Sequence, residues 1–240
     1  MELDKIYCED CFDGLQRIPS GIVDLIYTDP PYVVSKSSGG TVNNLKKLNV
    51  SLAQLDGAQL REGYEIERFA EEVKRLQGDR ICIYLWCNKA QIPEYFRTYV
   101  ERLKCRFDVL CWHKRNALPT YANKYLSDTE YCLYFHRGGR THPANYTDAQ
   151  TFDVGLINHA DKKRYNHPTI KPLDIVRRHI RNSSAPDAVV LDPFLGSGTT
   201  AVACIKEHRH YIGFERNIEF FSVAARRIRE ELTASALYVI

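Results

Sequence analysis

The alternation of short apolar runs with longer amphipathic segments constrains this fold more than any other feature. Runs such as VDLIYTD (23–29) and AVVLD (188–192) are largely continuous in apolar residues, which is typical of strands covered on both faces. Seven strands are predicted in this way, at Lys5–Asp10, Val23–Asp29, Arg80–Cys87, Phe107–His113, Glu130–His136, Ala188–Asp192 and His210–Glu215. Helices are predicted between them, at about Ile66–Leu76, Pro93–Leu103, Leu173–Arg181, Gly198–Lys206 and Ile218–Leu232. This order predicts an α/β fold with a Rossmann-like, doubly wound, mostly parallel seven-stranded sheet.

The length and composition agree with one globular domain over residues 1–240. The 240 residues are 44% hydrophobic and 26% charged, which excludes a disordered tail, a collagen-like repeat and a coiled-coil rod. No apolar run approaches the roughly 18 residues of a membrane span, and the N-terminal MELDKIYCED lacks the pattern of a secretory signal. The sequence therefore predicts a cytoplasmic protein that does not enter a membrane.

The cysteines indicate a reducing compartment rather than a metal site. Cys8 and Cys11 form a single C-x-x-C, and no second pair follows at zinc spacing. Most of the others lie in apolar runs such as ICIYLWC and YCLYF, as expected of small buried side chains. We predict no metal site.

Charge is nearly balanced along the chain, but one segment is strongly basic. The chain has 33 basic and 30 acidic residues, which argues only weakly for a polyanionic partner. Between residues 162 and 181, seven basic residues face a single acid, Asp174; they are Lys162, Lys163, Arg164, Lys171, Arg177, Arg178 and Arg181. This excess suits either a surface that follows DNA phosphates or a solvated helix face, and the sequence leaves both open.

The segment after the strand Val23–Asp29 brings together a carboxylate, a rigid turn and an aromatic ring. Asp29, Pro30, Pro31 and Tyr32 follow in order, and ligands of open α/β sheets bind beyond the carboxyl ends of strands. The prolines fix φ and remove N–H donors, which leaves carbonyl oxygens to accept hydrogen bonds. Such a site suits a planar group with an amine: Tyr32 stacks on it while the Asp29 carboxylate and the Pro30 carbonyl accept the two hydrogens. A proline-terminated strand with a surface tyrosine is the alternative.

A glycine-rich turn, DPFLGSGTT (192–200), joins the strand Ala188–Asp192 to the next helix. Gly196 and Gly198 let the backbone turn tightly and approach a ligand at the helix N-terminus. Glu215 ends the following strand, where an acidic side chain can bind ribose hydroxyls. The alternative is a glycine turn without a ligand.

A dinucleotide site is a second interpretation of this turn, since GSGTTA (196–201) fits G-x-G-x-x-A. Asp192 and Phe194 place a carboxylate and a ring where a pyrophosphate would be repelled. This favours a nucleoside without phosphates, and a cationic one is compatible.

A third segment, NHPTIKP (166–172), is made rigid by two prolines and carries polar side chains before a helix. Alone, this segment indicates only the entry to a helix.

Together these motifs resemble those of the S-adenosylmethionine-dependent amino-methyltransferases of DNA, in the circularly permuted (β) order. DPPY (29–32) precedes HPTIKP (167–172), DPFLGSGTT (192–200) and GFE (213–215), so the match spans almost the whole chain. Similar RNA methyltransferases usually place the tetrapeptide after the glycine loop, so the order favours DNA. The resemblance implies the methyltransferase fold, S-adenosylmethionine as cofactor and double-stranded DNA as partner.

The resemblance also implies roles at matching positions. A catalytic segment would hold the flipped base, with Asp29, Pro30, Pro31 and Tyr32. The cofactor would be bound by residues from four places: Asp10 near the adenine; His167, Thr169 and Lys171 closing over one side; the loop residues Asp192, Phe194, Gly196, Ser197, Gly198 and Thr199; and Glu215 on the ribose. The Asp10 match is the weakest, because the family more often has Gly-Asp where this chain has Glu9-Asp10.

The implied reaction is direct methyl transfer to an exocyclic amine. The target nucleotide must leave the duplex, and acceptance of both amine hydrogens favours a nitrogen whose lone pair faces the methyl group. Aspartate at the first motif position, here Asp29, is commoner in adenine-N6 enzymes, so we expect adenine as the target base, with cytosine-N4 as the alternative.

Two other functions compete with this interpretation: a catalytically inactive binding module of the same fold, and a nicotinamide dehydrogenase. The intact motifs argue against the inactive module. A dehydrogenase would have no use for DPPY and HPTIKP.

Recognition of a DNA sequence is expected from two further segments. Residues 33–63 suit a loop that closes over DNA and is mobile without it; unchanged protease sensitivity with DNA and cofactor bound would contradict this. Residues 114–166 contain short candidate recognition segments, with base-reading and phosphate-binding residue types such as Lys114, Arg115, Asn116, Tyr121 and Asn123. A homodimer and a cognate restriction endonuclease stay open as further partners.

Overall fold

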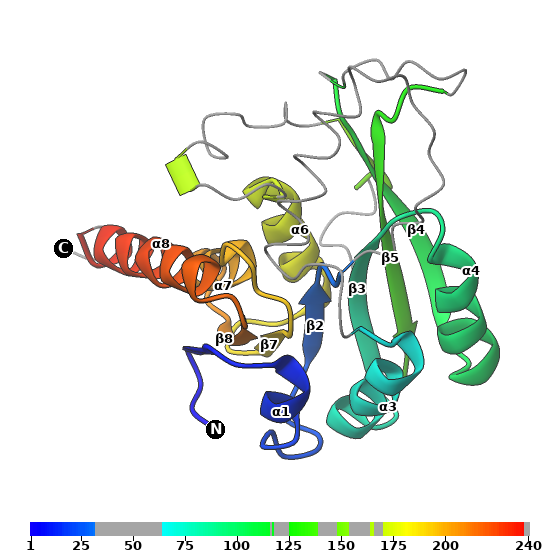
Figure 1. The fold of residues 1–240 in the computed structure, drawn as a ribbon, viewed down its shortest axis with the longest axis horizontal. Coiled ribbons are helices and arrows are strands. Elements are labelled where there is room, and N and C mark those ends of the chain that lie inside the picture. Colours follow the sequence, from blue (N-terminus) through cyan, green and yellow to red (C-terminus); the bar gives the residue numbers. More distant parts are fainter. Residues whose placement is uncertain are drawn as a thin grey trace.

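The computed structural model describes residues 1–31, 64–115, 117, 125–138, 148–153, 164–165 and 170–237. One sheet crosses the molecule, with helices on both of its faces (Figure 1). The whole of the expected loop 33–63 and more than half of the expected recognition segments in 114–166 lie outside the described residues.

In the described part of the chain, eight strands form one sheet in the order β1-β8-β7-β2-β3-β5-β4-β6. They are β1 (Lys5–Tyr7), β2 (Leu25–Thr28), β3 (Ile81–Cys87), β4 (Arg106–His113), β5 (Thr129–Arg137), β6 (Thr151–Phe152), β7 (Val189–Asp192) and β8 (His210–Phe214). Among the strands that the structure describes, only β5 runs against its neighbours β3 and β4, and every other pair is parallel. The expected mostly parallel, doubly wound sheet is therefore confirmed.

Two details of the prediction were wrong. The expected seven strands are joined by an eighth, β6, which pairs with Cys111 and Trp112 of β4; two residues without an apolar run are too short to give a periodic pattern. The first strand ends at Tyr7 rather than at Asp10. Asp10 instead caps the short helix α1 (Cys11–Leu15), where its carboxylate accepts a hydrogen bond from the Phe12 N–H at 2.9 Å.

Helices cover the two faces of the sheet in two groups. One face packs against α1, α3 (Ile66–Gln77) and α4 (Ile92–Tyr95), which continues as a π-helical segment, Phe96–Arg102. The other packs against α6 (Leu173–Ser183), α7 (Thr199–Lys206) and α8 (Ile218–Leu237). The expected apolar stripe of α3 is confirmed, because all five of its members are at most 4% exposed: Ile66, Phe69, Ala70, Val73 and Leu76.

Strand β3 shows why both helix layers are needed. All seven of its residues are buried, and alternate side chains enter the two cores, with Ile83 and Leu85 on one face and Tyr84 and Trp86 on the other. Burial of such apolar side chains contributes about 1.5–3 kcal/mol each. The continuous apolar run in the sequence is a direct consequence of this two-sided burial.

The connections of β2 and β7 diverge at the centre of the sheet. From β7 the chain passes through α7 to β8 on one side, and from β2 it passes through α3 to β3 on the other. Because α7 and α3 cover opposite faces, the order reverses between β7 and β2, where ligands of open α/β sheets bind beyond the carboxyl ends of the strands.

The antiparallel β5 brings its first residues to this same edge. Its register pairs Tyr131 with Cys87, the last residue of β3. Glu130 therefore lies beyond the carboxyl end of β3, although it stands at the start of its own strand.

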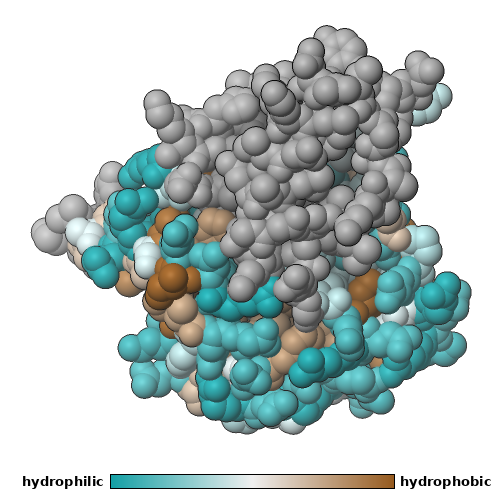
Figure 2. Space-filling model, in the orientation of Figure 1, coloured by the Kyte–Doolittle hydropathy of each residue, from teal (hydrophilic) through white to brown (hydrophobic). Residues whose placement is uncertain are grey.

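The surface of the described part carries few large hydrophobic side chains. On the face shown in Figure 2, hydrophilic residues dominate and hydrophobic ones form small separate patches. Among the helices described, none combines the length and the apolar character required to cross a membrane.

Candidate active site

The glycine-rich turn connects β7 to α7 at the centre of the carboxyl edge. Gly196 and Gly198 have positive φ values of 53° and 81°, a region that side chains other than glycine rarely adopt. A Cβ atom on Gly198 would lie 2.9 Å from the Cβ of Ala224 in α8. Glycine at this position therefore permits both the turn and the close approach of α8.

Asp192, at the end of β7, fastens this turn to β2. Its carboxylate accepts hydrogen bonds from the Thr28 hydroxyl (2.9 Å), the Thr200 hydroxyl (2.6 Å) and the Phe194 N–H (3.1 Å). Burial raises the pKa of Asp192 to about 7, although the three donors oppose this shift. The Thr28 contact crosses the point where the strand order reverses, so Asp192 joins the two halves of the sheet.

Glu215 is fixed against the other end of the glycine turn. One carboxylate oxygen accepts from the Gly196 N–H and the other from the Asn217 N–H, both at 2.8 Å. The side chain is buried, and burial raises its pKa while the two N–H donors oppose the rise. The structure thus brings together the glycine turn and the acid that the sequence paired with it.

Arg227 of α8 holds the glycine turn through hydrogen bonds, and this residue was not predicted from the sequence. Its guanidinium donates to the Ser197 carbonyl (2.8 Å), the Ser197 hydroxyl (2.9 Å) and the Thr199 hydroxyl (3.0 Å). It also lies 4.5 Å from the Tyr165 ring. Only its burial separates Arg227 from the exposed arginines of the same helix, and the sequence does not reveal burial there.

Phe194 projects from the turn toward α3. Its ring meets Tyr64 edge-on at 5.3 Å and Phe69 at 6.1 Å between centroids. Asp10 follows β1, which pairs with β8, so it lies at the same edge of the sheet. Its described hydrogen bond is the cap of α1.

Asp29, at the end of β2, forms an ion pair with Lys171. The Lys171 ammonium lies 2.5 Å from Oδ2 of Asp29, 3.2 Å from Oε2 of Glu130 and 5.0 Å from the centre of the Trp86 ring. Lys171 is buried. Burial opposes its charge, but the two carboxylates outweigh that effect and raise its pKa above the ordinary value.

Glu130 connects this pair to a second cation, Lys114, with which it also forms an ion pair. Burial opposes its ionisation, but Lys171 and Lys114 together lower its pKa to about 2. Sequence reasoning placed Glu130 at the start of a strand and gave it no role, because nothing in the sequence indicated that this strand runs antiparallel to its neighbours.

The backbone after Asp29 is fixed by Gln91, another residue that sequence reasoning missed. The Gln91 amide donates to the Pro31 carbonyl at 3.2 Å, and Pro30 is buried. Tyr32, His167 and Thr169 lie outside the described residues.

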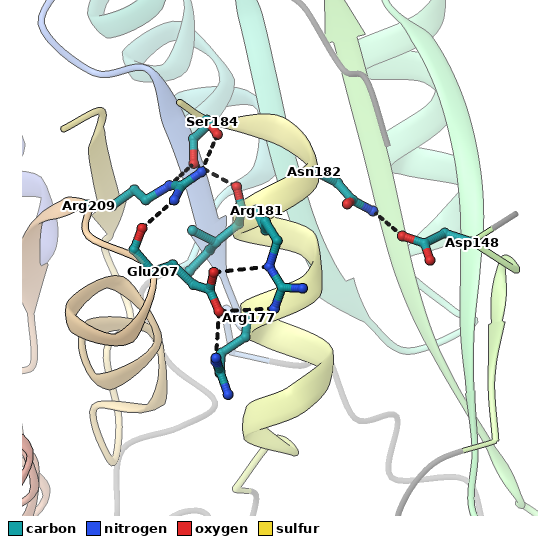
Figure 3. Close-up of polar contacts among 8 residues, drawn as sticks. Asp148, Arg177, Arg181, Asn182, Ser184, Glu207 and Arg209 are labelled. Atoms are coloured by element: carbon teal, nitrogen blue, oxygen red, sulfur yellow. Dashed lines mark hydrogen bonds and ion pairs between the residues drawn. The ribbon is translucent and has the colours of Figure 1, made fainter. Parts of the chain in front are cut away.

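The described members of the basic segment contact other groups of the same chain. Arg177 and Arg181 both bind Glu207, at 2.7 and 3.0 Å (Figure 3). Arg178 lies over the Phe152 ring at 4.8 Å, and Lys171 is buried at Asp29. Of the remaining members, Arg164 pairs with Glu230 at 3.1 Å, whereas Lys162 and Lys163 are outside the described residues.

The position of this cluster separates it from the candidate site. Glu207 and Arg209 precede β8, and Arg209 donates to the Ser184 carbonyl at 2.5 Å and to its hydroxyl at 3.1 Å (Figure 3). These groups therefore lie at the amino edge of the sheet, opposite Asp29 and the glycine turn. Neither interpretation left open for the basic segment, a phosphate-binding surface or a solvated helix face, describes the arginines of α6, which contact Glu207 and Phe152 of the same chain.

Most cysteines are buried, as predicted: Cys11, Cys82, Cys87, Cys105, Cys132 and Cys204. Within the described ranges, no group of three His, Cys, Asp or Glu side chains is arranged to hold a metal ion.

A glycine turn beside an acid lies across the sheet's reversal point from an Asp-Pro-Pro segment, an arrangement that suits a nucleoside-type ligand in a Rossmann-like fold. The DNA methylase family model matches residues 23–226, which include all of these features. The chain therefore belongs to the N6/N4 DNA methylase family, the S-adenosylmethionine-dependent DNA amino-methyltransferases, and the resemblance predicted from the motifs is confirmed.

Individual relatives align with this chain along nearly its whole length. The chain is 27% identical to the Type II methyltransferase M2.MboI of Moraxella bovis, over 94% of this chain and 88% of that protein. It is 26% identical to the Type II methyltransferase M.HpaI of Haemophilus parainfluenzae, over 95% of this chain and 74% of that protein. The PvuII DNA methyltransferase, described as cytosine-N4-specific, shares the fold, with a TM-score of 0.67 and 17% identity over 93% of this chain and 85% of that one.

Proposed function

We propose that this DNA methyltransferase transfers a methyl group from S-adenosylmethionine to the N6 amine of an adenine flipped out of double-stranded DNA. The observation that carries the proposal is the position of Asp29. Its carboxylate is held 2.5 Å from Lys171, across the reversal point of the sheet from the glycine turn. A hydrogen-bond acceptor thus lies across from the glycine turn at the edge where ligands of this fold bind, which supports a site where the base and the cofactor meet.

The described residues fit the cofactor that the family uses. Gly198 lets α8 pack directly against the turn, because a Cβ atom there would lie 2.9 Å from the Cβ of Ala224. The buried carboxylate of Glu215 suits ribose hydroxyls. When bound, S-adenosylmethionine supplies a methyl group attached to a cationic sulfur atom. Arg227 and Asp192 keep the turn in position through their contacts with Ser197, Thr199 and Thr200.

The catalytic work of the chain is the orientation of an amine. An exocyclic amine is a poor nucleophile because its lone pair is delocalised into the ring. Acceptance of its hydrogens by the Asp29 carboxylate and the Pro30 carbonyl favours a nitrogen whose lone pair points at the methyl group. Gln91 supports this geometry by holding the Pro31 carbonyl, and Tyr32 is proposed to stack on the base.

The target base must leave the duplex, since its amine is out of reach within the base stack. Asp29 at the first position of the tetrapeptide supports adenine, because the resemblance associates aspartate there with adenine-N6 enzymes. The fold does not choose between the bases, as the cytosine-N4-specific PvuII enzyme shares it. Cytosine-N4 is therefore the alternative outcome of the test below.

The relatives also support a biological context. M2.MboI and M.HpaI are both described as Type II methyltransferases. We infer that this chain is the modification enzyme of a restriction–modification system, in which methylation protects host DNA.

The test is expression of the wild type and of Asp29→Ala in a host without DNA methylation of its own, followed by mapping of modified bases by single-molecule sequencing. N6-methyladenine at one short motif, absent with the variant, is the expected result. N4-methylcytosine would keep the mechanism and overturn the base. Calorimetry with S-adenosylmethionine should show that Asp29→Ala still binds the cofactor, and an equal loss of binding would mean that Asp29 is structural.

A further inference from the structure

Four charged side chains of alternating sign form a continuous row at the candidate site. Asp29 follows β2, Lys171 precedes α6, Glu130 is the second residue of β5 and Lys114 follows β4. Lys171 bridges Asp29 and Glu130, and Glu130 bridges Lys171 and Lys114. These side chains come from four places in the fold, and the proposed function so far gives no role to Glu130 or Lys114.

The charge of Lys171 depends on both carboxylates. The side chain is only 8% exposed, and a buried ammonium is costly unless it is paired. The Trp86 ring, 5.0 Å away, adds a further favourable contact. Without Glu130, the buried ammonium would lose one of the two carboxylates described beside it.

We propose that Glu130 is a positioning residue for methyl transfer. It holds the Lys171 ammonium against Oδ2 of Asp29 and so fixes the orientation of the carboxylate that accepts the amine hydrogen. This inference rests on the proposed function, because it concerns the same site and the same reaction.

The geometry explains why a residue 101 positions away from Asp29 in the sequence has this task. β5 is antiparallel to β3, and it therefore delivers its first residues, rather than its last, to the carboxyl edge. Lys114 binds the other oxygen of Glu130, so the Glu130 carboxylate is held between two cations. A carboxylate held in this way can direct Lys171, whose own stem is long and flexible.

The groups that face Lys171 determine its response to pH. Besides Asp29 and Glu130, they are Tyr27 on β2, Cys87 on β3 and Cys132 on β5. A cavity of about 430 Å³ beside Lys171 is also lined by Arg164, Arg227, Glu230 and Glu231. Removal of the Glu130 charge leaves burial opposed mainly by Asp29, so the pKa of Lys171 falls in Glu130→Gln.

The experiment compares Glu130→Gln with the wild type in single-turnover methyl transfer to the mapped DNA motif. We expect a rate about 10- to 100-fold lower, the size of effect that small misplacements produce, with affinity for S-adenosylmethionine within about twofold. Glu207→Gln is the matched control, because Glu207 is also a buried carboxylate between two cations but lies at the opposite edge. It should transfer methyl groups at the wild-type rate.

Two readouts separate positioning from a structural role. The rate of Glu130→Gln should decline at high pH, at a pH where the wild-type rate is still constant, because its Lys171 loses a proton more easily. In a Lys171→Met background, Glu130→Gln should have no further effect, since Glu130 acts through Lys171. Thermal unfolding and cofactor calorimetry test whether each variant is folded. If Lys171→Met does not fold, the pH profile of Glu130→Gln alone decides between a positioning role and a structural role.

The outcomes are distinct from those of the proposed function. If the wild type methylates DNA and Glu130→Gln matches it in rate and pH profile, the positioning role is wrong and the proposed function stands. Independent, additive effects of Glu130→Gln and Lys171→Met would also overturn the role. If the wild type methylates no DNA, the proposed function itself fails.

Discussion

Replacement of Gly198 by alanine tests whether the glycine turn is shaped by its contact with α8. The backbone at Gly198 has φ of 81° and ψ of 19°, a left-handed conformation that costs an L-residue about 1–2 kcal/mol. The added Cβ would also lie 2.9 Å from the Ala224 Cβ and 3.1 Å from its Cα, well inside the ~3.5–4.0 Å of a favourable carbon–carbon separation. Overpacking of this kind costs about 1–3 kcal/mol, so the expected loss in unfolding free energy is about 2–5 kcal/mol.

Gly21 provides a matched control for the backbone contribution alone. It has nearly the same φ, 80°, but a Cβ there would have no heavy atom within 4 Å. Gly21→Ala should therefore cost only about 1–2 kcal/mol. Both variants are measured by urea unfolding with linear extrapolation. Gly198→Ala should also weaken S-adenosylmethionine binding in calorimetry, whereas Gly21→Ala should not.

A double-mutant cycle isolates the steric conflict with Ala224. Ala224→Gly alone should cost about 1 kcal/mol as a glycine within a helix, but less in the Gly198→Ala background, because it removes the atom that the new methyl group meets. The relief stays partial, because the backbone of residue 224 still lies 3.1 Å from the added methyl carbon. Equal losses in Gly198→Ala and Gly21→Ala, or strict additivity in the cycle, would refute the reasoning.

Two further predictions concern the carboxylates of the turn. Glu215→Gln leaves one acceptor oxygen for the two N–H donors of Gly196 and Asn217, and it should weaken cofactor binding by about 10- to 100-fold, roughly the worth of one charged hydrogen bond; unchanged affinity in calorimetry would contradict this. Asp192 has a native pKa of about 7 against an ordinary 3.8, so the native state holds a proton that the unfolded state releases. Stability of the wild type relative to Asp192→Asn should therefore fall as pH rises from about 4 to about 7, and a flat difference in unfolding free energy over that range would show that the pKa is not raised.

The sequence determined those features that arise from local periodicity and local conformation. The strand β3 and the apolar stripe of α3 were predictable because residues buried on both faces, or on one helical face, repeat at fixed intervals. Gly196 and Gly198 were predictable for a similar reason, since a strand-to-helix turn needs positive φ. The motif order identified the family, because each motif is a short continuous segment.

Only the tertiary structure decided which side chains meet. Lys171 lies 142 positions from Asp29 in the sequence yet contacts its carboxylate, and Glu130 joins them because β5 runs antiparallel. The sequence left the partners of Arg227 and of the basic residues of α6 equally open, since an arginine is compatible with solvent, a phosphate or a buried carboxylate. The physical reason is that burial and pairing of a charge depend on neighbours supplied by other elements, and a local pattern does not contain those neighbours.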